Sequence, residues 1–282
     1  MDKLESKKLL PEVSIVRPIL IICIVIGHCF APYSGAWDLP KNINGETLYS
    51  WINPLFISFQ LQAFVFISGY LYSYQKKTSS NIQFIYKKFK RLIIPAIFFG
   101  IIYYLLFRFE RDYFNISNAI IQILSGIGHL WFLPMLFWCF FIIRFLDKII
   151  ISNIIKLALL FPLTIIPVPI PFGIGVSLHY VFFFYCGIFV FTNKNSFDFI
   201  LCKRKYIILF LFILFWSINF YLGNTIVPER NSLFIKLCFS LFAFFIGTFG
   251  TLLMYSITIE HTKARQDISK FIISGGKICF GV

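Results

Sequence analysis

The sequence predicts an all-α fold, a polytopic bundle of transmembrane helices, and three observations support this prediction. First, 59% of the 282 residues are hydrophobic and only 13% are charged, whereas soluble domains are about 45–50% apolar and about 25% charged. Second, apolar runs long enough to cross a hydrocarbon layer of about 30 Å recur along the chain. Third, these runs do not alternate between apolar and polar residues, which argues against the strands of a transmembrane barrel.

Eight apolar segments are expected to be full spans. They cover residues 13–30, 52–74, 92–107, 129–146, 154–166, 178–191, 206–222 and 233–257. Segment 154–166 is the shortest, and the prolines at 167, 169 and 171 end it because proline cannot continue a regular helix. A ninth apolar segment begins near residue 271 and is too short to span before residue 282. We therefore expect a truncated ninth span.

Basic residues predict the orientation of these spans. Lys3, Lys7 and Lys8 precede the first span and place the N-terminus in the cytoplasm, with the first span uncleaved. The strongest cytoplasmic signal is residues 75–91, which carry six cations and no acid. Apolar residues at 82, 85, 89 and 92 recur there at helical spacing, which predicts a short amphipathic helix at the membrane interface. Basic loops are also expected near residues 192–205 and 258–270.

The net charge of +14 has a simple explanation in this topology. In a soluble protein it would suggest nucleic acid, but here the cations lie in predicted cytoplasmic loops and no basic domain stands outside the membrane. We therefore expect no nucleic-acid partner. The seven cysteines are scattered and lack the spacing of a zinc site or a disulfide framework, so they are expected to be small buried apolar side chains. We expect one transmembrane domain, residues 1–282, incomplete at its C-terminal end.

Arg17 and His28 lie eleven residues apart in the first predicted span. An α-helix turns about 100° and rises about 1.5 Å per residue, so the two side chains would share one face about 16 Å apart, roughly half of a hydrocarbon core. Arg17 either reaches the cytoplasmic headgroups or holds an anionic ligand. His28 is either a neutral side chain bonded to a neighbouring backbone or a general base or nucleophile, because an imidazole pKa of about 6.5 suits proton transfer.

Two further segments carry candidate binding residues. Ser68 and Gly69, within residues 66–70, are small enough to let a neighbouring helix or a ligand approach closely. Lys88 and Arg91 lie three apart at the end of the basic loop. They either fix the orientation of the chain or contact phosphates at the cytoplasmic mouth.

His129 and His179 begin predicted spans on the outer side, where His28 ends one. A metal site is conceivable, but no carboxylate or short histidine spacing supports it, so we expect no metal. Every acidic residue lies outside the predicted spans or at their ends. A proton-driven transporter is expected to carry Asp or Glu inside its bundle, so this pattern argues against transport.

Four motifs in this order resemble the acyltransferase 3 family, membrane enzymes that O-acylate cell-surface sugars. They are Arg17 with His28; Phe66, Ser68, Gly69 and Tyr70; Lys88, Arg91, Leu92 and Pro95; and His129, Leu130, Trp131, Phe132 and Leu133. The resemblance covers most of the chain and implies about ten spans in total. It also implies an enzyme of the bacterial plasma (inner) membrane.

The resemblance implies transfer of an acyl group, which we expect to be acetyl, from cytoplasmic acyl-CoA to a hydroxyl of an extracytoplasmic glycan or lipid-linked saccharide. His28 would be catalytic, and Arg17, Lys88, Arg91, Ser68, Gly69 and Tyr70 would bind acyl-CoA. His129 and Trp131 would lie at the acceptor side. Acyl-CoA would be a co-substrate, with no permanently bound cofactor, and membrane lipid would surround the bundle. Direct transfer and an acyl-histidine intermediate both remain open.

Two other function classes fit parts of the sequence. A transporter or flippase of a lipid-linked sugar would explain the spans and the aromatic residues, but not the matched pair of Arg17 and His28. A structural membrane subunit would leave both polar residues without a purpose.

Overall fold

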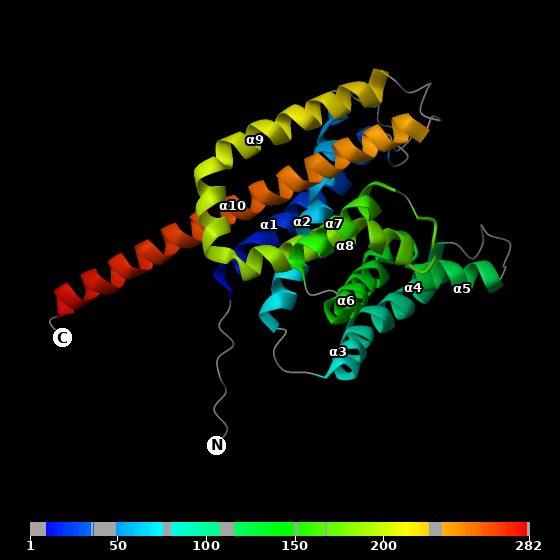
Figure 1. Cartoon of the computed structure of the whole chain (residues 1–282), viewed down its shortest axis with the longest axis horizontal. Coiled ribbons are helices and arrows are strands. Elements are labelled where there is room, and N and C mark those ends of the chain that lie inside the picture. The colour runs from blue at the N-terminus through cyan, green and yellow to red at the C-terminus, as the bar shows by residue number, and fades with distance from the viewer. Residues whose placement is uncertain are drawn as a thin grey trace. The chain divides into compact units, whose positions relative to one another are not determined.

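The computed structural model describes residues 10–34, 36, 49–75, 80–107, 116–149, 152–166, 168–225 and 233–280. Every regular element in these residues is a helix (Figure 1). The early cations Lys3, Lys7 and Lys8, and Lys76 and Lys77 of the basic loop, lie outside the described residues.

Seven helical segments in the described part of the chain are long and apolar enough to cross a membrane, which confirms the all-α polytopic bundle. They are α1 (Pro11–Cys29), α2 (Ile52–Gln75), α3 (Asn81–Lys88) continuing through the π turn η3 (Phe89–Ile93) into α4 (Ile94–Phe107), η4 (Gly128–Trp131) with α6 (Phe132–Ile149), α8 (Ile174–Thr192), α9 (Lys194–Thr225) and α10 (Leu233–Phe280). Shorter elements are η1 (Pro32–Ser34), α5 (Ile116–Ser125) and α7 (Asn153–Ile165).

The sequence predicts eight full spans, and seven of them are long enough to cross in the part of the chain that the structure describes. Predicted span 154–166 is α7, which has 13 residues. At about 1.5 Å per residue it rises about 20 Å, less than a hydrocarbon core of about 30 Å. The helix ends before Ile166, and residues 168–173 form no regular helix, as the prolines predict.

Two predicted loops are helical instead. α9 begins at Lys194, and α10 continues without a break through residues 258–270 to Phe280. Neither stretch contains glycine or proline, and both are rich in lysine, arginine and other good helix formers, so charge alone does not end the helix. The expected ninth segment is therefore part of α10 and not a separate span.

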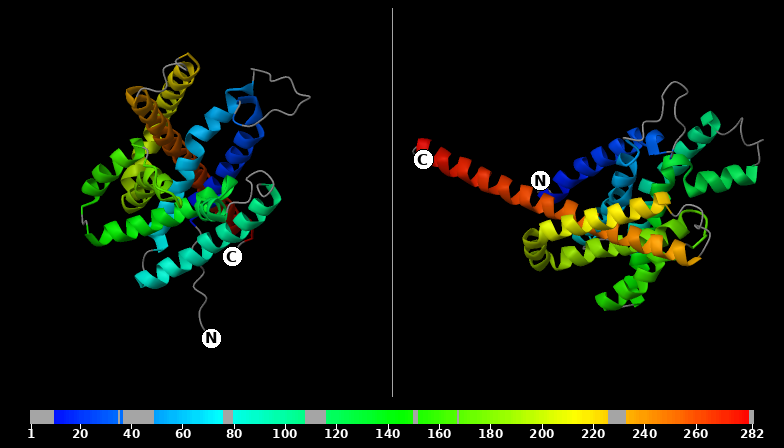
Figure 2. Two further views of the ribbon diagram at one scale, coloured as in Figure 1. Left: turned by 90° about the vertical axis from the view of Figure 1, so that its right-hand side faces the viewer. Right: turned by 90° about the horizontal axis from the view of Figure 1, so that it is seen from above.

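The structure divides into two compact units. The first contains α1, residues 52–64 of α2, all of α9 and most of α10. Its core takes one buried residue from each helix, Cys23, Phe59, Phe212 and Ile246. The ring centroids of Phe59 and Phe212 lie 5.5 Å apart, edge to face. Within this unit α9 and α10 lie side by side (Figures 1 and 2), and Phe215 packs on three phenylalanines of α10.

The second unit contains residues 65–192, together with residues 236–241. Its core includes Tyr72 of α2, Phe140 of α6 and Phe184 of α8, with ring centroids 4.9–5.8 Å apart. Trp131 pairs with Tyr180, and Phe140 with Phe184, so α6 and α8 run in the same direction. This agrees with the direction that the sequence predicts for these two spans.

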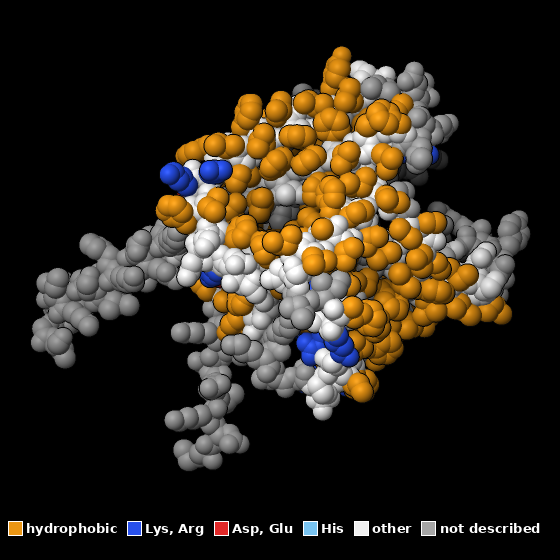
Figure 3. Space-filling model, viewed as in Figure 1, with side chains coloured by type: hydrophobic (Ala, Val, Ile, Leu, Met, Phe, Trp, Pro, Cys, Tyr) orange, Lys and Arg blue, Asp and Glu red, His pale blue; other side chains and the backbone are white. Residues whose placement is uncertain are grey.

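Helix α4 presents an apolar surface that suits lipid. Phe98 and Leu106 are 59% and 70% exposed, and Figure 3 shows hydrophobic side chains covering the visible face of this region. Outside a membrane such a surface would be exposed to water, so its composition supports the membrane assignment.

Candidate functional site

Helix α1 carries both Arg17 and His28. The helix continues past Pro18, so the eleven-residue spacing corresponds to a rise of about 16 Å and nearly the same face. Arg17 is exposed and His28 is half-buried. An exposed guanidinium and a half-buried imidazole on one helix can serve two separated parts of one elongated ligand.

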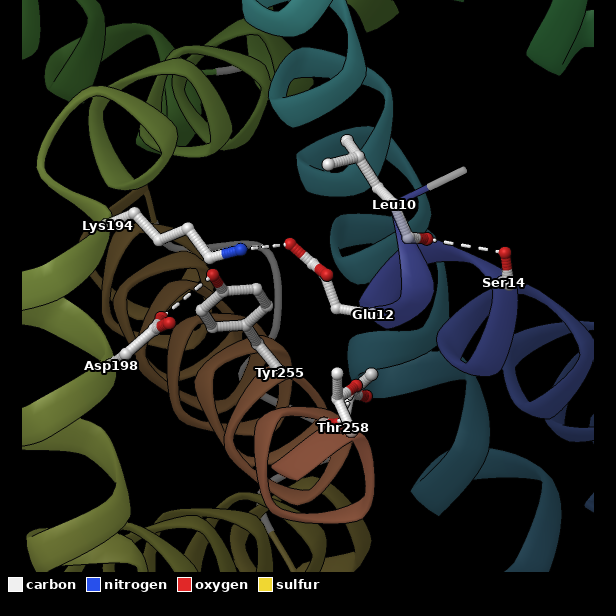
Figure 4. Close-up of polar contacts among 8 residues, drawn as sticks. Leu10, Glu12, Ser14, Lys194, Asp198, Tyr255 and Thr258 are labelled. Atoms are coloured by element: carbon white, nitrogen blue, oxygen red, sulfur yellow. Dashed lines mark hydrogen bonds and ion pairs between the residues drawn. The ribbon is translucent and has the colours of Figure 1, made fainter. Parts of the chain in front are cut away.

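The start of α1 is held by a polar cluster within the first unit (Figure 4). Glu12 is 4% exposed and pairs with Lys194 at the start of α9. Nearby, the hydroxyl of Tyr255 in α10 donates to Asp198 of α9 over 3.0 Å. Glu12, Lys194 and Asp198 border a pocket of about 290 Å³. Because Glu12 precedes Arg17 by five residues, the cluster fixes the position of the helix turn that leads to Arg17.

The end of α1 is held by the first turn of α2. The side-chain nitrogen Nδ2 of Asn53 donates to the main-chain carbonyl of Gly27 over 2.6 Å, and Asn53 is only 3% exposed. Gly27 is also buried and immediately precedes His28. The backbone that carries the imidazole is therefore bonded to a second helix.

The basic end of the second unit contains Arg144, a cation that is not among the site residues predicted from the sequence. It lies close to the predicted site residue Lys88, since both contact the ring of Phe84. Lys88 Nζ lies 3.8 Å from the ring centroid of Phe140 and 5.3 Å from that of Phe84. The guanidinium carbon of Arg144 lies 5.3 Å from the same Phe84 ring. Its nitrogens donate to the Asn81 side chain over 2.6 Å and to the Tyr72 hydroxyl over 3.3 Å.

Arg144 could have been found from its setting in the sequence. It interrupts an apolar run in the fourth predicted span, and an ionisable side chain inside a span is expected to be functional or paired. With Lys88, Arg144 places two positive charges beside one aromatic ring, an arrangement suited to phosphate groups.

Arg91 lies in the π turn η3 and is exposed. A π turn bonds each residue to one five positions away, which widens the helix. The α-helical spacing that predicts a shared face for Lys88 and Arg91 therefore does not hold unchanged across this turn.

The predicted amphipathic helix is α3, which confirms its helical character. Its apolar residues Ile82 and Ile85, together with Phe89, line a pocket of about 490 Å³ against Phe141 and Lys148 of α6. The pocket also contains Asn81, the side chain that accepts from Arg144. A largely apolar groove thus adjoins the cations at this end of the unit.

Gly69 lies at a close crossing of α2 and α8. A β-carbon on Gly69 would lie 1.8 Å from the carbonyl oxygen of Phe184, and one on Gly187 would lie 2.0 Å from that of Phe66. Tyr70 is fully buried. The geometry supports the helix-packing alternative for this motif, and contacts of Ser68, Gly69 and Tyr70 with acyl-CoA stay a prediction.

His129 and Trp131 lie in η4, after a tight turn. Gly126 and Gly128 have φ of +84° and +61°, in the left-handed region where glycine is favoured. The Trp131 ring lies 6.3 Å from that of Tyr180, which in turn lies 4.9 Å from the ring of His179. Tyr180 is a neighbour that the sequence prediction did not name. In the described residues no group of three or more His, Cys, Asp or Glu side chains could hold a metal ion.

Comparison with known protein families identifies the family of this chain. The family model of the acyltransferase domain, acyltransferase 3, matches residues 10–282. The chain belongs to the acyltransferase 3 family. No curated protein and no solved structure matches it. The protein is thus an acyltransferase with several membrane-spanning helices, and the resemblance expected from Arg17, His28 and the other motifs is confirmed at the level of the family.

Proposed function

We propose that this acyltransferase moves an acetyl group from cytoplasmic acetyl-CoA to a hydroxyl of an extracytoplasmic glycan or lipid-linked saccharide. It does so in the bacterial plasma membrane, with its N-terminus in the cytoplasm. The observation that carries the proposal is the placement of Arg17 and His28 on one helix, nearly on the same face and about 16 Å apart.

Arg17 binds an anionic group of acetyl-CoA. A guanidinium suits phosphate because it presents several donors in a planar fork. The phosphates of CoA are separated from its thioester by a long, flexible arm. The spacing between Arg17 and His28 supplies a matching separation between an anion-binding group and a reacting group.

His28 acts on the thioester. In direct transfer, its neutral imidazole takes the proton of the acceptor hydroxyl while that oxygen attacks the thioester carbonyl carbon. The carbon–sulfur bond breaks, and the CoA thiolate takes the proton back from the imidazolium and leaves as a thiol. In the second route the imidazole nitrogen attacks the thioester carbonyl carbon, the carbon–sulfur bond breaks, and CoA leaves as a thiolate, which gives an acyl-histidine. The acceptor oxygen then attacks the acyl carbon, the carbon–nitrogen bond breaks, and the hydroxyl proton passes through the freed imidazole to the thiolate.

The second unit has cations and an aromatic face of its own that suit the two substrates. Lys88, Arg91 and Arg144 supply positive charge for the phosphates of acetyl-CoA. Trp131 offers an aromatic face on which a sugar ring can stack, and His129 lies in the same turn. The close packing of Trp131 with Tyr180 supports a fixed position for this face.

Transfer of label tests the proposal. Membranes from cells that produce the chain are incubated with acetyl-CoA labelled in its acetyl group, beside membranes that lack the chain. Label in the glycan fraction only when the chain is present is the expected result. Movement of a lipid-linked sugar across the membrane without acetylation would contradict it and favour a flippase. Parallel assays with longer acyl-CoA donors establish which acyl group is used.

A further inference from the structure

The carbonyl of Gly27 needs a partner from outside α1. The last four carbonyls of a helix have no partner within it. If α1 were longer, the N–H of Ala31 would donate a hydrogen bond to the carbonyl of Gly27. Here that N–H donates to the carbonyl of His28 over 3.2 Å. Asn53 fills this role, since its Nδ2 donates to Gly27 over 2.6 Å in a buried position.

The chemistry of the partners fixes the orientation of the Asn53 amide. A carbonyl oxygen can only accept, so the nitrogen of the amide must face Gly27. The other end, Oδ1, lies 2.9 Å from the hydroxyl of Ser34, which is also 3.0 Å from the carbonyl of Ala31. The single hydroxyl proton of Ser34 serves these two acceptors. One polar chain thus connects the turn after α1 to the first turn of α2.

Packing strengthens this connection. A β-carbon on Gly27 would lie 3.4 Å from both Phe56 Cβ and Gln60 Oε1. Asn53, Phe56 and Gln60 recur at three and four residues and so lie along one side of α2. Two turns of α2 therefore pack against Gly27, the residue before His28. A shift of the Asn53 bond would therefore move the backbone of His28.

We propose that Asn53 is a positioning residue for acyl transfer, because its amide holds the Gly27 carbonyl and thereby orients the turn of α1 that presents His28. The inference rests on the proposed function, in which His28 acts on the thioester. Catalysis depends steeply on such placement, since a displacement of about 1 Å can cost about a hundredfold in rate.

The test compares Asn53→Asp with the wild type and with Gln62→Leu. The aspartate is nearly isosteric but, when ionised, cannot donate to Gly27. Gln62 is a matched control, a buried amide of α2 that lies against Gly247 of α10 and whose Oε1 has no partner. At neutral pH we expect Asn53→Asp to lower kcat about tenfold to a hundredfold with KM for acetyl-CoA little changed, and Gln62→Leu to leave both near wild type.

The pH dependence separates positioning from general loss of structure. A protonated carboxyl group can donate to Gly27 where the ionised one cannot, and burial favours the protonated form. The kcat of Asn53→Asp relative to wild type should therefore rise as the pH falls. A ratio that stays the same from acidic to alkaline pH, where the carboxyl group must ionise, overturns the positioning role.

Two further variants keep the outcomes distinct. If wild-type membranes transfer no label, the proposed function fails. If His28→Ala is fully active, the role of His28 fails and the positioning inference fails with it, whatever Asn53→Asp does. If His28→Ala is inactive while Asn53→Asp keeps wild-type kcat, only the positioning inference fails. Should Asn53→Asp not accumulate, Ser34→Ala tests the same connection. It removes the hydroxyl that orients the amide and should lower kcat about threefold to tenfold, again without changing KM. An unchanged kcat overturns the inference.

Discussion

Gly69 of α2 lies so close to the main chain of Phe184 in α8 that a β-carbon on it would be 1.8 Å from the Phe184 carbonyl oxygen. Gly187 of α8 makes the reciprocal approach to Phe66. Backbones can come this close only where side chains are absent, as at many helix crossings in membranes. The pair therefore sets the spacing between α2 and α8.

Gly69→Ala should destabilise the protein by about 2 kcal/mol or more, because the new methyl group meets rigid backbone and the helices must move apart. Thermal unfolding of the purified protein, followed by loss of soluble protein on heating, measures the effect. Gly223→Ala in α9 is the control, since nothing lies within 4 Å of its β-carbon position. Equal melting temperatures for the two variants would contradict a close crossing at Gly69.

The sequence predicts the membrane helices well because a span is a local property. Apolar runs such as those of α1 and α2 identify their helices within one or two residues. Helix ends depend on more than charge, so the cations near residues 194–205 and 263–270 suggested loops where the backbone stays helical. Helix α5 lies between the predicted spans 92–107 and 129–146, and its ten residues are too few to be recognised as a span.

Arg17→Ala should raise KM for acetyl-CoA about tenfold or more while kcat changes little, because a guanidinium that holds phosphate contributes to binding rather than to the chemical step. Initial rates over a range of acetyl-CoA concentrations measure both constants. Arg17→Lys keeps the charge but loses the planar fork, so a smaller rise is expected. An unchanged KM in Arg17→Ala would contradict a role for this side chain in binding acetyl-CoA.

Lys88→Gln and Arg144→Gln should each raise KM for acetyl-CoA about threefold to tenfold, and the wild-type KM should rise with salt as phosphate contacts are screened. Arg144→Gln should also lower stability, because Asn81 and Tyr72 lose their donor. The control is Lys205→Gln, which removes a cation paired with Glu260 outside the proposed machinery. The phosphate role is contradicted if Lys205→Gln raises KM as much as the other two.

Trp131→Ala should weaken binding of the sugar acceptor, since stacking on an aromatic face contributes about 1 kcal/mol. The expected result is a severalfold higher KM for the acceptor with KM for acetyl-CoA unchanged. Trp131→Phe keeps a ring and should restore most of the affinity. Trp138→Phe serves as the control, because its indole N–H donates to the carbonyl of Phe172 and its loss should affect stability alone. Equal KM values for the acceptor in wild type and Trp131→Ala would contradict a stacking role for Trp131.

The candidate site was predictable only where its residues share one helix. Arg17 and His28 could be related by counting residues because α1 is continuous. Asn53 and Gly27 are 26 residues apart, and Arg144 and Asn81 are 63 apart, so their contacts depend on tertiary packing that no spacing encodes. Buried polar side chains in spans are the one local signal for such partners, because each needs a partner in an apolar setting.

The proposed mechanism depends most on His28, which acts on the thioester. The most direct measurement is the initial rate of labelled acetyl transfer by His28→Ala, in membranes with equal amounts of wild-type and variant protein. A general base contributes about a hundredfold to ten-thousandfold, so the rate should fall by that much. His261→Ala, which alters an exposed histidine of α10, should keep the wild-type rate. A rate for His28→Ala within about twofold of wild type would contradict a catalytic role for His28, because a general base requires a loss of about a hundredfold or more.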